Sequence, residues 1–131
     1  MYKTLTINGT EYEFKFGFGF VKAISRVKLK DGEEIGLRYR VAQLYDGNPE
    51  ALVDVLMKAR VKTNAPTMEE LQEWLEDENT DIDAVFDQVL DFLSTANCSK
   101  KQTLDMLASV KEEGEIQKAE TAKRRKEAGL D

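Results

Sequence analysis

The first part of the chain alternates between apolar and polar residues. The apolar positions stand on either side of an Asn-Gly pair and are Leu5, Ile7, Tyr12, Phe14 and Phe16. An Asn-Gly pair tolerates the positive φ angles of a type I′ turn, and a two-residue turn at positions 8 and 9 pairs Leu5 with Tyr12. The apolar side chains then share one face, and threonines and charged residues share the other. We therefore expect an antiparallel hairpin with one buried face.

The rest of the chain repeats its apolar residues at the spacing of amphipathic helices. These stripes predict about five or six short helices, whose apolar residues are Phe20, Ile24 and Val27; Leu37, Val41, Leu44 and Tyr45; Leu52, Val55, Leu56 and Ala59; Leu71, Trp74 and Leu75; Ile82, Val85, Phe86, Val89, Leu90 and Leu93; and Leu104, Leu107 and Val110. The stripe over 82–93 is the most regular, so we expect its helix to be central. Because two strands alone are marginally stable, the helices must cover the hairpin.

Capping residues indicate where several helices begin. The Asn-Pro pair at 48–49 is typical of an N-cap followed by a proline in the first turn. Thr67 with Glu70 has the spacing of a capping box, and Ser99 with Gln102 offers another. Beyond about residue 114 the apolar stripe ends. The pattern predicts one α+β domain over 1–114, a hairpin packed on a helical bundle, and a charged helix or disordered tail over 115–131.

The composition removes several kinds of chemistry. The 131 residues include no histidine, which is the commonest general base and metal ligand, and one cysteine, Cys98, which cannot form an internal disulfide. No apolar run is long enough for a membrane span. We expect a soluble, cytosolic, non-enzymatic protein without metal or cofactor. The net charge of −6 disfavours a protein whose main task is to coat nucleic acid.

Charge is unevenly distributed along the chain. Residues 1–62 carry eleven basic and eight acidic side chains, whereas residues 63–99 carry ten acidic side chains and no Lys or Arg. A basic half and an acidic half can attract copies of the chain head to tail, into a ring or a filament. The side chains that we expect to take part are Lys22, Arg26, Arg38 and Arg40 on the basic side and Glu69, Glu70, Glu73 and Glu76 on the acidic side.

Two glycines separate the predicted hairpin from the first helix, in the run Phe16-Gly17-Phe18-Gly19-Phe20. A dinucleotide-binding loop would occupy this place, but Lys22 stands where its third glycine belongs and no parallel strand pattern follows. We interpret Gly17 and Gly19 as residues that let the chain turn sharply into the helix.

One stretch carries a resemblance to a known family. It reads Leu5-Thr6-Ile7-Asn8-Gly9 and then Tyr12-Glu13-Phe14-Lys15-Phe16-Gly17-Phe18-Gly19-Phe20. With the short helix and the acidic helices that follow, it resembles the tail assembly chaperones of long-tailed bacteriophages and prophages, most closely over residues 5–24 and in layout to about residue 110. The resemblance implies a non-enzymatic, oligomeric late protein of the host bacterial cytoplasm that is absent from the mature virion.

The resemblance also implies partners. Such a chaperone holds the tape measure protein soluble while tail tube subunits polymerise, and a frameshifted longer form would contact the tail tube protein. The candidate client-binding residues are Phe18, Phe20, Met68 and Trp74. Two alternatives stay open: a small regulator that binds nucleic acid through the basic residues of 22–40 or of 123–126, and a structural tail component.

Overall fold

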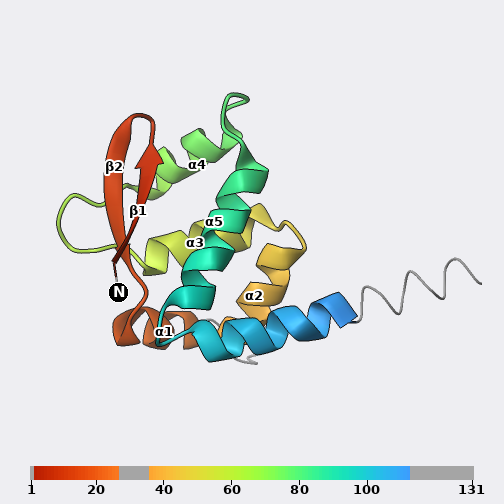
Figure 1. The fold of residues 1–131 in the computed structure, drawn as a ribbon. Coiled ribbons are helices and arrows are strands. Elements are labelled where there is room, and N and C mark those ends of the chain that lie inside the picture. Colours follow the sequence, from red (N-terminus) through yellow and green to blue (C-terminus); the bar gives the residue numbers. More distant parts are fainter. Residues whose placement is uncertain (1, 27–35, 113–131) are drawn as a thin grey trace, which may run out of the picture.

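A computed structural model describes residues 2–26 and 36–112 of the protein (Figure 1). The elements in chain order are β1 (Tyr2–Ile7), β2 (Thr10–Lys15), α1 (Phe18–Ser25), α2 (Leu37–Tyr45), α3 (Pro49–Lys58), α4 (Met68–Glu76) and α5 (Ile82–Thr95). A further helix, called here the C-terminal helix, begins at residue 100 and is described to residue 112. A hairpin followed by helices is the α+β fold that the sequence predicts.

The hairpin forms with the predicted register. Leu5 pairs with Tyr12 in the antiparallel ladder. The turn residues Asn8 and Gly9 have φ angles of 51° and 82°, the left-handed conformation that a type I′ turn requires. Neither Gly17 nor Gly19 has such an angle, so the conformational freedom of glycine is not what turns the chain into α1, contrary to our interpretation of the sequence.

The apolar face of the hairpin is buried as predicted, with Leu5, Ile7, Phe14 and Phe16 at most 3% exposed. The chain after α3 also covers part of the outer edge of β2. The Lys15 amide donates to the Ala59 carbonyl at 2.7 Å, and residues 14 and 60 form an isolated antiparallel bridge. These contacts fix the hairpin to the end of α3 through the backbone.

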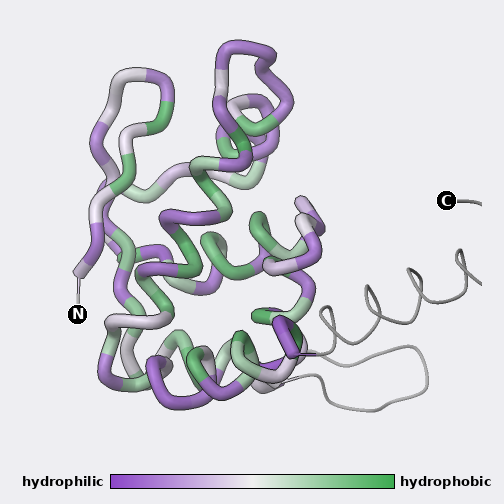
Figure 2. Tube along the Cα trace, turned by 45° about the vertical axis from the view of Figure 1, so that its right-hand side comes forward, coloured by the Kyte–Doolittle hydropathy of each residue, from purple (hydrophilic) through white to green (hydrophobic). Residues whose placement is uncertain are grey.

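The helices enclose one apolar core. Figure 2 shows hydrophobic and hydrophilic positions alternating along each helix, as packed amphipathic helices require. α3 packs against α1, α2 and α4, and its inward residues, Ala51, Leu52, Val55 and Leu56, are completely buried. α5, the helix of the 82–93 stripe, packs against α2 and buries Val85, Phe86, Val89 and Leu93 in the same core.

All three predicted helix starts are confirmed, two of them with the predicted capping contacts. The Asn48 side chain caps α3, whose first residue is Pro49, and Thr67 with Glu70 forms the capping box of α4. Ser99 behaves differently. Its hydroxyl donates to the Leu93 carbonyl at 2.7 Å, so it ties the end of α5 to the start of the C-terminal helix instead of forming a box with residue 102.

The C-terminal helix buries a face that the sequence misplaces. Leu104 is 53% exposed, whereas Thr103 is completely buried and Leu107 and Val110 are half-buried. Tyr45 likewise lies at the surface, 43% exposed. The predictions for Val27 and for the segment after residue 114 lie outside the described residues.

Candidate functional site

An apolar groove of about 560 Å³ lies between α3 and α4, with the start of α5 at one end. We call it the α3–α4 groove, and its lining residues are Pro49, Glu50, Val53, Asp54, Met68, Gln72, Leu75, Glu76 and Ile82. Most of the lining is apolar, and Met68 is 48% exposed although it is a large hydrophobic side chain. A concave apolar surface of this kind suits the apolar side chains of a partner.

Helical geometry explains how α4 serves both the core and the groove. Leu71 and Trp74 are buried against the core. Met68, Gln72 and Leu75 are spaced four and then three residues apart, so they form a second stripe beside the first one. The capping box of Thr67 fixes where the helix begins, and therefore which side chains face the groove.

The solvent side of the groove is negatively charged. On α4 the exposed residues Glu69, Glu73 and Glu76 lie beside the groove stripe, on the solvent side of the helix. Glu50 lies in the first turn of α3. We call these four residues the acidic rim. None of them takes part in a salt bridge within residues 2–26 and 36–112. The rim therefore presents free carboxylates beside an apolar surface.

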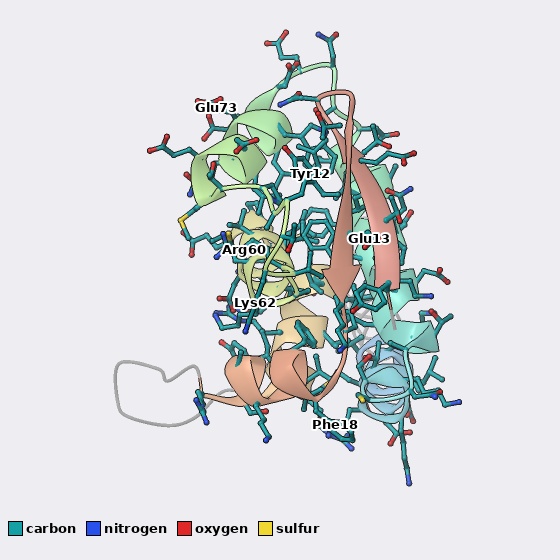
Figure 3. All side chains as sticks on the ribbon, turned by 90° about the vertical axis from the view of Figure 1, so that its left-hand side faces the viewer. Tyr12, Glu13, Phe18, Arg60, Lys62 and Glu73 are labelled. Carbon is teal, nitrogen blue, oxygen red and sulfur yellow. The ribbon has the colours of Figure 1, made fainter. Side chains whose placement is uncertain are left out.

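Glu70 does not belong to this rim. It lies on the hairpin side of α4, where its Oε2 accepts a hydrogen bond of 3.1 Å from the Tyr12 hydroxyl. Figure 3 labels Tyr12 on this side of the helix and Glu73 on the other. Hydrogen bonds from Thr67 and Tyr12 hold the pKa of Glu70 below its ordinary value of 4.5. Its role is to attach α4 to the hairpin.

The carboxylate in the floor of the groove is neutralised within the protein. Asp54 lies 3.0 Å from the Arg40 Nε and also pairs with Lys58. The Arg40 side chain is only 13% exposed. Arg40 is therefore unavailable for the contact between copies that the charge pattern predicts, because its charge is used inside the fold.

A second surface feature stands at the start of α1. Phe18 is 78% exposed, and Lys15, Lys58 and Arg60 line a hollow of about 480 Å³ beside it. Lys22 lies one turn further along the same face of α1 and is also exposed. We call Phe18, Lys15, Lys22 and Arg60 the Phe18 end. Figure 3 shows Phe18 at the far end of the molecule from α4.

The structure separates the predicted client-binding residues into two groups. Phe18 and Met68 both lie at the surface, in α1 and in α4, and these two helices lie apart in Figure 1. Phe20 and Trp74 are core residues, 3% and 8% exposed, and the ring of Phe20 packs edge-on against Phe16 with centroids 5.1 Å apart. Neither buried ring can contact a partner without unpacking the core.

The basic residues predicted for self-association are also divided. Lys22 and Arg26 are exposed on and just after α1. Arg38 lies 3.7 Å from Asp105 of the C-terminal helix, and Arg40 is held by Asp54. Sequence reasoning missed the groove itself, although the spacing of residues 68, 72 and 75 was a usable signal for it.

The described residues contain no group of three or more acidic, histidine or cysteine side chains placed to hold a metal ion. Asp83, Asp87 and Asp91 form an exposed stripe on α5, and Cys98 is half-buried with a free thiol. No helix within these residues is both long and apolar enough to cross a membrane.

A comparison with known protein families gives a match. A family model described as "Phage tail assembly chaperone protein, TAC" matches residues 4–108, which include the hairpin, the α3–α4 groove and the Phe18 end. No curated protein matches the chain, and no solved structure does.

Proposed function

The chain belongs to the phage tail assembly chaperone family, and on that premise we propose that it binds the tape measure protein and keeps it soluble while the tail tube polymerises. The binding is reversible and involves no covalent chemistry. The chaperone acts in the cytoplasm of the host bacterium as a homo-oligomer and leaves before the virion is complete. A frameshifted longer form brings in the tail tube protein.

The α3–α4 groove is the observation that carries this proposal. A tape measure protein is largely long amphipathic helix, and the apolar stripes of such helices associate with each other in water unless they are covered. A helix docks by placing apolar residues from successive turns into a groove. Met68, Val53 and Leu75 supply apolar contacts of this kind. The acidic rim keeps the complex soluble and favours client helices whose apolar stripe is bordered by Lys or Arg.

Co-expression tests the proposal directly. A candidate tape measure protein is produced together with the parent chaperone, with Met68→Glu or with Leu104→Glu. Met68→Glu places a charge in the groove, so it should lower the soluble yield of the client and weaken binding of a client helix about tenfold or more. Leu104→Glu adds the same charge at a comparably exposed position on the C-terminal helix, so it should behave like the parent.

Equal loss in both variants, or no loss in either, would contradict the role of the groove. The two alternative functions predict other results. A structural tail component would be found by mass spectrometry in purified particles. A nucleic-acid-binding regulator would retain DNA or RNA with an affinity that falls steeply with salt and with charge reversal of Lys22.

A further inference from the structure

The Phe18 ring is exposed to an extent that the fold does not require. It stands between two glycines, so no side chain of an adjacent residue shields it, and it is the most exposed large hydrophobic residue among residues 2–26 and 36–112. The core does not need Phe18, because Phe16 and Phe20 already join the hairpin to α1. An exposed aromatic ring with basic residues nearby is typical of a residue that anchors a protein contact.

The α3–α4 groove is complementary to the Phe18 end. The groove is concave, apolar and bordered by the carboxylates of the acidic rim. The Phe18 end carries an exposed aromatic ring, and its charged members, Lys15, Lys22 and Arg60, are all basic. Within the described residues, none of these three makes a salt bridge. Polarity and charge therefore match between the two regions.

The two regions cannot meet within one molecule. α1 and α4 lie at opposite ends of the fold in both Figure 1 and Figure 3. A contact between them needs two copies of the chain, and each copy then keeps one unused Phe18 end or one unused groove. Contacts of this head-to-tail kind continue into a ring or a filament.

We propose that Phe18 of one copy docks into the α3–α4 groove of the next copy, with Lys22 and Lys15 facing the acidic rim. In this contact the Phe18 ring packs against Met68, Leu75 and Val53 in the lining of the groove. One consequence rests on the proposed function: a second copy and a client helix compete for the same groove, so client binding shortens the assemblies.

Complementing variants test this contact. The size of the full chain is measured against concentration by analytical ultracentrifugation for the parent, Phe18→Ala, Met68→Glu and the control Tyr39→Ala, whose parent residue is 44% exposed on α2. We expect Phe18→Ala and Met68→Glu each to weaken self-association about tenfold or more, and Tyr39→Ala to leave it unchanged. Added salt should weaken the association of the parent, because the rim charges are exposed.

Mixing the two variants gives the decisive measurement. The Phe18→Ala chain keeps an intact groove and the Met68→Glu chain keeps an intact Phe18, so an equimolar mixture should form dimers and nothing larger. A parent that stays monomeric, a Phe18→Ala chain that assembles like the parent, or a mixture that stays monomeric would each overturn the proposal. Circular dichroism melting checks that both variants are folded.

The same variants separate this proposal from the proposed function. Phe18→Ala should bind a client helix at least as tightly as the parent does, because its groove is unchanged and no Phe18 of a second copy competes for it. If no variant binds the client and the mixture still dimerises, the proposed function fails and the head-to-tail contact stands. If Phe18→Ala assembles like the parent while Met68→Glu alone loses the client, the reverse holds.

Discussion

Tyr12 and Glu70 are joined by a hydrogen bond of 3.1 Å across 58 residues of sequence. Glu70 also accepts from the Thr67 amide at 3.3 Å, so one carboxylate both caps α4 and attaches that helix to the hairpin. Since α4 forms one wall of the α3–α4 groove, this hydrogen bond helps to hold that wall against the hairpin.

The Tyr12–Glu70 pair should make stability depend on pH at both extremes. The pKa of Glu70 is lowered in the folded state, so its contribution is present above its ordinary value of 4.5 and is lost as the pH falls through the lowered value. Partial burial, and then the neighbouring Glu70, raise the pKa of Tyr12, so its contribution is present below 10.0 and is lost as the pH rises through the raised value.

Tyr12→Phe removes one of the hydrogen bonds that lower the pKa of Glu70. We expect that pKa to move up toward 4.5, measured by NMR titration of the carboxyl carbon. The loss of stability on acidification should then be smaller than in the parent. Tyr45→Phe, which alters an exposed tyrosine on α2, is the control. An unchanged titration of Glu70 in Tyr12→Phe would show that the hydrogen bond is absent in solution.

Phe18 and Phe20 should respond in opposite ways to truncation. Phe20→Ala removes a ring that is 3% exposed and packs on Phe16, so it should lower the free energy of unfolding by about 3–5 kcal/mol. Phe18→Ala removes a ring that is 78% exposed, so the free energy of unfolding should change by less than about 0.5 kcal/mol. Urea unfolding followed by circular dichroism measures both, and similar losses would contradict the structure.

Gly19 should tolerate a side chain. It lies in the first turn of α1 with an ordinary negative φ, and a Cβ at this position would meet no atom within 4 Å. Gly19→Ala should therefore raise the free energy of unfolding by about 0.4–1 kcal/mol, because alanine loses less backbone entropy on folding. Gly9→Ala is the contrasting variant. Its φ of 82° is strained for any residue with a Cβ, so the melting temperature of Gly9→Ala should be lower than that of the parent.

Thr103 should be more stable as valine. Its side chain is completely buried in the C-terminal helix, and its hydroxyl has no hydrogen-bond partner. Thr103→Val keeps the shape and removes the unpaired polar group, so we expect a gain of about 1 kcal/mol in chemical unfolding. Thr103→Ser keeps the hydroxyl and removes the methyl group, so it should destabilise. A loss of stability in Thr103→Val would mean that the Thr103 hydroxyl has a hydrogen-bond partner in solution.

Local signals were enough to predict the elements of this fold. The Asn-Gly turn determined the pairing of Leu5 with Tyr12, and Thr67 with Glu70 located the start of α4, because both signals act over a few residues. Three-dimensional neighbours decided the rest. Periodicity could not show which helices α3 packs against, or that Leu104 faces solvent.

The candidate site was only partly predictable for the same reason. Met68 and Phe18 were selected as apolar side chains for a partner, and both are exposed. Phe20 and Trp74 have the same chemistry but lie in the core, a difference that depends on packing. Counting charges placed Arg40 among the groups available to another copy, whereas its pairing with Asp54 appears only when α2 and α3 are packed together.

The backbone contacts between β2 and the end of α3 set an order for folding during synthesis. The Lys15 amide donates its hydrogen bond to the carbonyl of Ala59, and Phe14 forms its backbone bridge with Arg60. Both contacts require residues 59 and 60 to have been synthesised. A nascent chain that has left the ribosome only as far as α1 has a hairpin with no cover, and such a hairpin is marginally stable. The two strands at the start of the chain are therefore fully paired only after roughly half of the polypeptide has emerged, and general chaperones can act on them during that interval.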